Sequence, residues 1–341
     1  MSEAEVTREG VRRQRPGRDA VPGAEGRRRR PGRRRRRGEP TVVPEAEFGS
    51  YYGRPIIKPP TWKAADIAGY LFLGGLAGGS SALAAGAELT GRPALARAAK
   101  IGALGAISLS TAALIHDLGR PGRFGNMLRV FKPTSPMSVG SWILLGYGPA
   151  AGVAAVTDAT GLFRRAGRAA TGWSALSGAA VTCYTAVLIA DTAVPAWHEG
   201  YREMPFVFAG SGAASAAGLG LLAAPVREAA PARGAALFGA ALELAAVRRM
   251  ERRLGPLAEP YRGGRAGLLM RAAKVLTIAG SAGAALPAGR SRAGAALCGA
   301  ALLTGSACLR FGIFEAGRVS ATDPHYTVLA QRSDRKAATP A

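Results

Sequence analysis

Residues 64–89 read AADIAGYLFLGGLAGGSSALAAGAEL, an apolar run whose only charged side chains are Asp66 and Glu88. A helix of about 20 mostly apolar residues is long enough to cross the hydrocarbon core of a bilayer. Within the run, 74–79 (GGLAGG) contains two overlapping GxxxG spacings, which allow helix backbones to approach closely in lipid. The stretch therefore predicts a membrane-spanning helix that packs tightly against its neighbours.

Seven further apolar runs follow, and together they predict an all-α integral membrane protein, a bundle of about eight transmembrane helices. They are Ala94–Leu118, Met137–Val156, Thr171–Val194, Met204–Ala224, Gly234–Val247, Ala266–Ala288 and Ala293–Phe314. The sixth of the eight predicted spans, Gly234–Val247, is short, and the seventh contains Arg271 and Lys274. The charged segment 248–264 contains two prolines and is interpreted as a loop.

The N-terminal segment differs sharply in composition from the rest of the chain. Residues 1–40 contain 14 Arg against six acidic residues and almost no large apolar side chain. Such a segment cannot bury enough surface to offset its chain entropy, so we predict an Arg-rich disordered tail. The predicted domains are a disordered basic tail (1–50), a transmembrane domain (51–318) and a polar C-terminal tail (319–341).

Two interpretations of the basic tail are a nucleic-acid-binding arm and an anchor lying on anionic lipid headgroups. The second is favoured because membrane spans follow, so we expect membrane lipids and no nucleic acid as partners. An even number of spans puts both termini on one side, together with the loops 119–136, 195–203 and 248–265. The positive-inside rule then predicts a multi-pass protein of the cytoplasmic membrane with cytoplasmic termini.

Polar side chains cluster where the second and fourth predicted spans end on this same side. They are His116, Asp117, Tyr184, Asp191, Trp197, His198 and Glu199. Asp191 is predicted to lie about one turn inside an apolar helix, where ionisable groups are costly and usually functional. Tyr184 lies seven residues earlier and therefore on the same face. A purely structural interpretation fits part of the cluster, because Trp197 is a natural interfacial anchor and Pro195 ends or bends a helix.

Redox chemistry of a quinone needs this combination of groups. Its two carbonyl oxygens must be held by donors, and protons must pass through a carboxylate or an imidazole. We therefore predict quinone binding by His116, Tyr184, Trp197 and His198, and a proton relay through Asp117, Asp191 and Glu199. The pattern does not exclude a proton-coupled transporter, which would show similar groups.

Glu243 is a second carboxylate inside a predicted span, at a depth similar to that of Arg271 and Lys274. We predict a structural ion pair between these residues inside the bundle, with a role in a proton path as the alternative.

The sequence lacks the residue patterns that bind several common redox cofactors. Its three histidines include His325 in the polar C-terminal tail, whereas two bis-His haems would need four buried histidines. Cys183, Cys298 and Cys308 have no metal-site or iron–sulfur spacing, and no phosphate or dinucleotide motif is present. We therefore expect no haem, iron–sulfur cluster, metal site or catalytic residue, and redox centres that belong to a partner.

Several motifs resemble the NrfD/PsrC family of membrane subunits, over roughly residues 50–332. They are Tyr51–Pro55, Ile57–Pro60 before Trp62, Asp66–Tyr70, His116–Arg123, Phe131–Ser138, Asp191–Glu199, Phe314–Gly317 and Asp323–Tyr326. The resemblance is weak over 225–290, and the arginine tail lies outside it.

The resemblance implies a haem-free bundle of eight membrane helices that anchors a molybdopterin catalytic subunit and an iron–sulfur ferredoxin-like subunit. It implies electron exchange with menaquinone or another quinone, near the face that docks the iron–sulfur subunit. The partner would be formate dehydrogenase-like or polysulfide/thiosulfate reductase-like, working in anaerobic respiration.

Two other functions stay open. A secondary transporter would favour internal repeats and carboxylates near the middle of the bilayer, and no convincing repeat is visible. A structural anchor without quinone chemistry would not need Asp191 within the membrane.

Overall fold

The computed structural model describes residues 6–7, 10–11, 55–118 and 122–338. The chain divides into two compact units, one of residues 60–320 and one of residues 1–59 with 321–341. In the second unit, β1 (Val6–Thr7) pairs antiparallel with β2 (Gly10–Val11), and α12 spans Pro324–Ala338. The rest of the predicted disordered tail lies outside the described residues.

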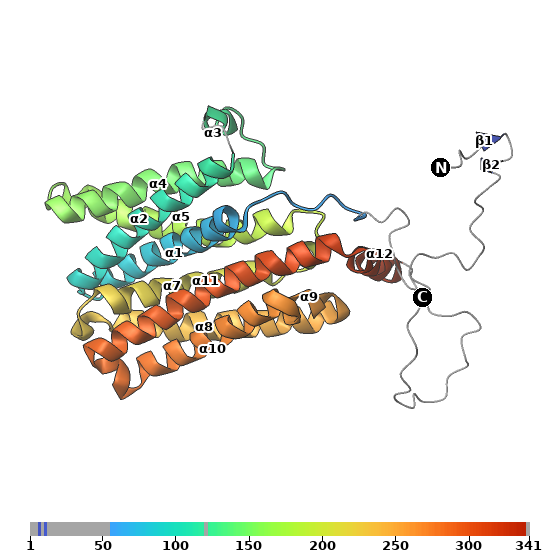
Figure 1. Ribbon diagram of the computed structural model, residues 1–341. Helices are drawn as coiled ribbons and strands as arrows, with labels where there is room; N and C mark the ends of the chain where they lie inside the picture. The colour runs from blue at the N-terminus through green and yellow to red at the C-terminus, as the bar shows by residue number, and fades with distance from the viewer. Residues whose placement is uncertain (1–5, 8–9, 12–54, 119–121, 339–341) are drawn as a thin grey trace. The chain divides into compact units, whose positions relative to one another are not determined.

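The described residues include eight helices that are long and apolar enough to cross a membrane. They are α1 (Ala64–Leu89), α2 (Pro93–Asp117), α4 (Pro136–Thr160), α5 (Arg164–Ala190), α7 (Met204–Ala223), α8 (Ala230–Leu254), α10 (Gly264–Ala285) and α11 (Arg292–Thr322). Figure 1 shows these helices running alongside one another as a single bundle. The predicted all-α membrane fold with eight spans is confirmed.

Short helical segments join the long helices. They are α3 (Gly122–Met127), α6 (Pro195–His198) and α9 (Glu259–Arg262), with 3-10 turns at Val226–Glu228, Gly255–Ala258 and Pro287–Arg290. Local sequence explains several of the helix ends. Pro93 and Pro136 occupy first helical positions, where a missing N–H costs nothing. Gly161 ends α4 with φ of 72°, a left-handed conformation that glycine adopts without strain.

Predicted boundaries of α5, α8 and α11 are wrong, and α11 continues to Thr322 rather than ending at Phe314. Helix α5 begins at Arg164 rather than Thr171 and ends at Ala190 rather than Val194. Helix α8 continues to Leu254, and a 3-10 turn and α9 follow, so most of the predicted loop 248–264 is helical. Hydropathy marks the part of a helix that lies in hydrocarbon, whereas the helix itself continues through arginine-rich turns that good helix formers support.

Helix α1 packs against α2, α5 and α7, and its glycines set the spacing. A Cβ added at Gly78 would lie 2.1 Å from the carbonyl oxygen of Gly178 on α5. A Cβ added at Gly79 would lie 2.3 Å from the carbonyl oxygen of Gly212 on α7. The close approach predicted from the GxxxG spacings is therefore present on two sides of α1.

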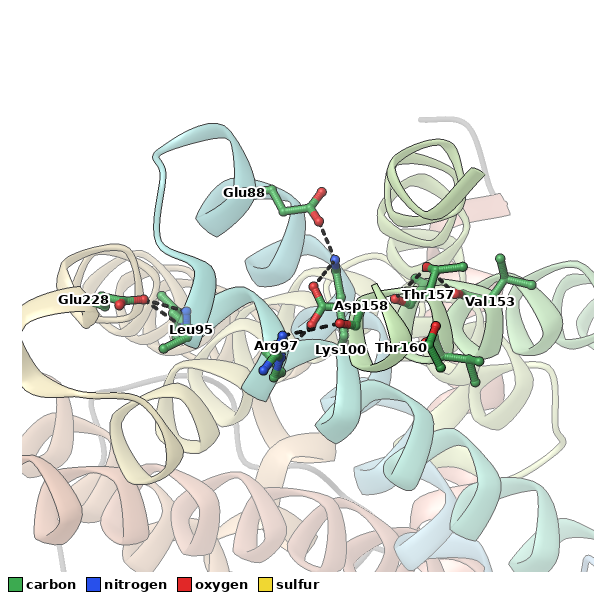
Figure 2. Close-up of polar contacts among 12 residues, drawn as sticks. Glu88, Leu95, Arg97, Lys100, Val153, Thr157, Asp158, Thr160 and Glu228 are labelled. Carbon is green, nitrogen blue, oxygen red and sulfur yellow. Dashed lines mark hydrogen bonds and ion pairs between the residues drawn. The ribbon is translucent and has the colours of Figure 1, made fainter. Parts of the chain in front are cut away.

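The bundle has two ends that carry different polar groups. One, here called the His116 end, brings His116 near the end of α2 against Asp66 at the start of α1. The other, the Lys100 end, joins Glu88 of α1, Lys100 of α2 and Asp158 of α4, as Figure 2 shows.

At the Lys100 end, the buried amine of Lys100 contacts the carboxylates of both Glu88 and Asp158, the latter at 3.1 Å. Arg97 adds a 2.9 Å bond to Asp158. Close by, the Glu228 carboxylate accepts the main-chain N–H groups of Ala94 and Leu95 at the start of α2 (Figure 2). A carboxylate at a helix N-terminus satisfies unpaired donors and complements the helix dipole. This end is therefore a set of structural ion pairs and caps.

Replacing Lys100 by methionine should destabilise the bundle by about 2–3 kcal/mol, because it leaves two partly buried carboxylates without their shared cation. SDS titration in mixed micelles measures the change. Replacing Arg97, whose side chain is 61% exposed, by methionine is the matched control and should cost less than about 1 kcal/mol. Equal losses of stability in the two variants would contradict the conclusion that Lys100 is the main cation for the carboxylates of Glu88 and Asp158.

Candidate functional site

The His116 end carries an imidazole–carboxylate pair between two helices. His116 lies in the last turn of α2, and its Nδ1 is 3.0 Å from Oδ2 of Asp66 in the first turn of α1. The His116 side chain is 67% exposed, whereas that of Asp66 is 16% exposed. Asp117 lies within electrostatic range of both residues and of Lys63. When Nδ1 donates to Asp66, Nε2 is left facing outward and can accept or release a proton.

A pair of phenols lies on the same side of α1. The side chains of Tyr70 on α1 and Tyr184 on α5 are both buried, and the two phenols lie close enough to interact electrostatically. The Tyr184 ring packs on Gly140 of α4, where an added Cβ would lie 1.7 Å from the ring. Ser110 of α2 donates to the Tyr70 carbonyl oxygen at 3.1 Å. Helices α1, α2, α4 and α5 thus enclose this pair.

Helix α1 connects the two pairs. Asp66 and Tyr70 are four residues apart, so they lie one above the other on one helix face. His116 and Tyr184, which the sequence singled out, are therefore linked through two residues of α1 that were not among the predicted site residues. The i, i+4 spacing of Asp66 and Tyr70 at the start of an apolar helix was the signal that could have found them.

Trp197 occupies a structural position. Its indole is fully buried, and its Nε1–H donates to the carbonyl oxygen of Ile313 on α11 at 2.8 Å. The ring stacks on Trp62 with centroids 6.0 Å apart and packs against Phe314 and Gly317. Because its only donor is used, Trp197 is not included among the quinone contacts proposed below.

The environment predicted for Asp191 is wrong. The residue caps the C-terminus of α5, after the helix has ended at Ala190, and its side chain is exposed. His198 is also exposed, and its Nδ1 lies 3.2 Å from the carbonyl oxygen of Ala190. In the described part of the chain, no hydrogen bond or ion pair joins Asp191, His198 or Glu199 to His116 or Tyr184. The roles predicted for these three residues stay predictions.

Sequence reasoning missed a buried carboxylate beside this segment. Glu203, 3% exposed at the start of α7, accepts hydrogen bonds from Arg253 of α8, with Nε 2.9 Å from Oε1 and Nη2 2.7 Å from Oε2. Arg253 also donates to the main-chain carbonyl oxygen of Glu199. A bidentate arginine–carboxylate pair is strong and directional. It fixes the end of α8 to residues 199–203, which directly follow α6 and His198.

The predicted ion pair of Glu243 with Arg271 or Lys274 is absent from the described residues. Glu243 is 1% exposed, and its Oε1 accepts a 3.0 Å hydrogen bond from Thr277 of α10, while Oε2 has no partner. Its electrostatic partner is Arg310 of α11. Arg271 and Lys274 are exposed on α10, because their positions on that helix point outward rather than to the interior.

Arg310 is the largest fully buried charged side chain among the described residues, and it was not predicted. It is fully buried, donates from Nη2 to the Phe208 carbonyl oxygen at 3.0 Å, and lies 3.5 Å from the centroid of the Phe208 ring. Its Nε and Nη1 have no hydrogen-bond partner. A guanidinium over an aromatic face gains a cation–π attraction that grows when water is excluded. The single Arg in an apolar stretch of α11 was the available signal.

These observations define the class of protein: a multi-pass integral membrane protein with a polar site at one end of its bundle. The family model described as polysulphide reductase, NrfD matches residues 59–234. The chain belongs to this family, as its motifs predict. No curated protein sequence matches the chain. The matched range contains Asp66, Tyr70, His116 and Tyr184, whereas Glu243 and Arg310 lie outside it.

Proposed function

We propose that this protein is a quinone-interacting membrane subunit that passes electrons between a membrane quinone and an iron–sulfur partner. Membrane subunits of the NrfD family accompany the iron–sulfur and molybdopterin subunits of oxidoreductases. The observation that carries the proposal is the link from the His116–Asp66 pair to the Tyr70–Tyr184 pair along one face of α1.

The donor set suits a quinone such as menaquinone. A quinone offers two carbonyl oxygens that accept hydrogen bonds, and phenol and imidazole groups are suitable donors. Tyr184 would hold one oxygen from inside the bundle, and His116 the other from its surface. The absence of a side chain at Gly140 leaves room for the Tyr184 ring between α4 and α5. A bound quinone would supply two-electron, two-proton redox chemistry.

The residues of the chain have separate tasks in this proposal. Asp66 orients the imidazole of His116 through its 3.0 Å contact with Nδ1. His116 and Asp117, at the edge of the site, exchange protons with water. The Tyr184 hydroxyl, which lies beside Tyr70, would donate a hydrogen bond to the ligand. Asp191, His198 and Glu199 lie on the same end of the bundle and would support proton exchange or partner docking.

The proposed partners follow the family: an iron–sulfur ferredoxin-like subunit and a molybdopterin catalytic subunit. Purification of the tagged protein from membranes, with mass spectrometry and quinone extraction, tests the complex. Recovery of both subunits together with quinone is the expected result. A homo-oligomer without partner subunits and without quinone would contradict it.

Tyr184→Phe should reduce quinone-coupled electron transfer about 10- to 100-fold while leaving complex assembly unchanged, because it removes one buried donor and little volume. Turnover of the purified complex with a soluble quinone analogue, and the quinone that co-purifies, are the two measurements. The matched control is Tyr147→Phe, which removes another buried phenol hydroxyl, one bonded to Ser81 at 2.9 Å. If both variants turn over normally and keep quinone, the protein is a structural anchor rather than a quinone subunit.

A proton-coupled transporter is the second candidate, because the interior cluster of Glu243 and Arg310 holds polar atoms without partners. Buried ionisable groups of this kind mark ion pathways in many membrane proteins. Proton flux into liposomes that contain the protein without any partner subunit separates the two functions. Flux that Glu243→Gln abolishes would favour the transporter.

A further inference from the structure

A basic groove lies between α8 and α10 at the His116 end. Its volume is about 740 Å³, and its wall includes Glu243, Glu251, Tyr261, Met270, Ile278 and Leu309. This volume is typical of ligand sites in proteins. The groove also contains five basic side chains: Arg248, Arg252, Arg262, Arg271 and Lys274.

Most of this positive charge has no ion-pair partner among the residues that the structure describes. Arg262 is paired with Glu251 at 3.2 Å, and the Glu243 carboxylate is turned to Thr277. In the described residues, no ion pair is formed by the remaining four cations, namely Arg248, Arg252, Arg271 and Lys274. A groove with four unpaired cations is complementary to an anionic ligand.

The position of two of these cations places the groove at the lipid boundary. Arg271 and Lys274 lie within the membrane-crossing helix α10, yet both are exposed. Side chains on a helix lean toward its N-terminus, so both long side chains are directed to the membrane surface where α10 begins. Arg248 and Arg252, in the last turns of α8, lie at that same surface. The four cations therefore converge at the level of lipid headgroups.

The rest of the groove suits an acyl chain. Ile278 lies one turn beyond Lys274, toward the membrane interior, and Leu309 of α11 lines the same groove. On the outer surface of α10, Leu268 and Val275 are 62% and 63% exposed. Exposed apolar side chains on a membrane-crossing helix are typical of a face in contact with lipid.

We propose that this groove binds the phosphate headgroup of an anionic phospholipid, with one acyl chain along Ile278 and Leu309. A soluble partner is a poorer match, because the groove continues from the cations along Ile278 and Leu309, which lie deeper in the membrane-crossing helices. The proposal is independent of quinone chemistry and adds a lipid-binding site to the protein.

The experiment compares the detergent-purified protein with Arg271→Gln/Lys274→Gln and with a matched control, Arg164→Gln/Arg165→Gln. The control removes two exposed arginines at the start of α5, at the Lys100 end. Phosphatidylglycerol, phosphatidylcholine and inorganic phosphate are titrated separately, and the melting temperature is followed. Each basic residue contributes about fivefold to binding at an anionic surface, so the groove variant should bind phosphatidylglycerol about 25-fold more weakly.

The wild type and the control should be stabilised by phosphatidylglycerol at similar concentrations, with no shift from phosphatidylcholine or inorganic phosphate. The charge-conserving variant Arg271→Lys/Lys274→Arg should keep most of the phosphatidylglycerol binding. Its result shows that weak binding by the Gln variant comes from the lost charge and not from a folding defect. Equal binding by the groove variant and the wild type would overturn the proposal. An equal loss of phosphatidylglycerol binding in the control would overturn the proposal too. So would stabilisation by free phosphate alone. The same holds if the groove variant loses its co-purified partner subunits while its lipid binding is unchanged.

Discussion

Replacing Arg310 by alanine should lower the free energy of unfolding by roughly 3–5 kcal/mol. The change removes a fully buried guanidinium that bonds to the Phe208 carbonyl oxygen and lies on the Phe208 ring. It also leaves the carboxylate of Glu243 without its electrostatic partner in the interior. SDS titration of the purified protein in mixed micelles measures the loss.

The control for this prediction is Arg164→Ala at an exposed position, which should change stability by less than about 0.5 kcal/mol. The double variant Arg310→Met/Glu243→Gln should recover most of the stability, because an interior without either charge has no unpaired ion. If Arg310→Ala alone were as stable as the wild type, Arg310 and Glu243 would not be an interacting pair.

The second large effect is expected from Gly78→Ala, which should destabilise the bundle by about 2–3 kcal/mol. The new methyl group would lie 2.1 Å from the Gly178 carbonyl oxygen and 2.3 Å from Oγ1 of Thr182. Backbone atoms cannot rotate away, so α1 and α5 must separate, and overpacking of this kind costs 1–3 kcal/mol. The midpoint of unfolding in SDS is the measurement.

Gly86→Ala on the same helix is the matched control, because nothing lies within 4 Å of the added Cβ. This substitution should leave stability unchanged or raise it by up to about 1 kcal/mol, since alanine is the better helix former. A similar loss in both variants would mean that α1 needs glycine for its backbone rather than for its contact with α5.

Both predictions depend on the close packing of α1 against its neighbouring helices. Glycines bring α1 close to α5 and α7, and the same closeness leaves little room around Arg310, whose Nη2 would lie 3.0 Å from a Cβ at Gly75. Small residues therefore allow the helices to pack closely. The same close packing fixes the surroundings of the buried Arg310. The Tyr70–Tyr184 pair depends on Gly140 in the same way.

The fold was largely predictable from the sequence. Runs of about 20 apolar residues have one stable form in lipid, because backbone groups must be hydrogen-bonded within the segment. At the start of α5 and at the ends of α8 and α11, the wrong boundaries lie where arginines flank an apolar run, and the helix continues beyond the hydropathic segment. At the end of α5 the reverse holds, because the helix ends at Ala190 while the apolar run continues to Val194.

The site was predictable only in part. His116 and Tyr184 were found because polar side chains at the ends of apolar helices are conspicuous. Asp66 and Tyr70 were missed because their importance arises from neighbours that are 50 residues away or more. Asp191 was placed inside a helix that in fact ends one residue earlier.

The sequence by itself determined that this is a multi-pass membrane protein, where most of the eight candidate membrane-crossing helices of the described residues lie, and the family to which it belongs. These properties depend on local composition and on short motifs, which a sequence carries in full. Only the tertiary structure decided the pairings and neighbours: Glu243 within electrostatic range of Arg310 rather than paired with Arg271 or Lys274, Trp197 bonded to the main chain of α11, and Glu203 bonded to Arg253. Pairings depend on the rotation of each helix about its axis. This rotation is set by packing against neighbouring helices, so it cannot be read from the sequence of a single helix.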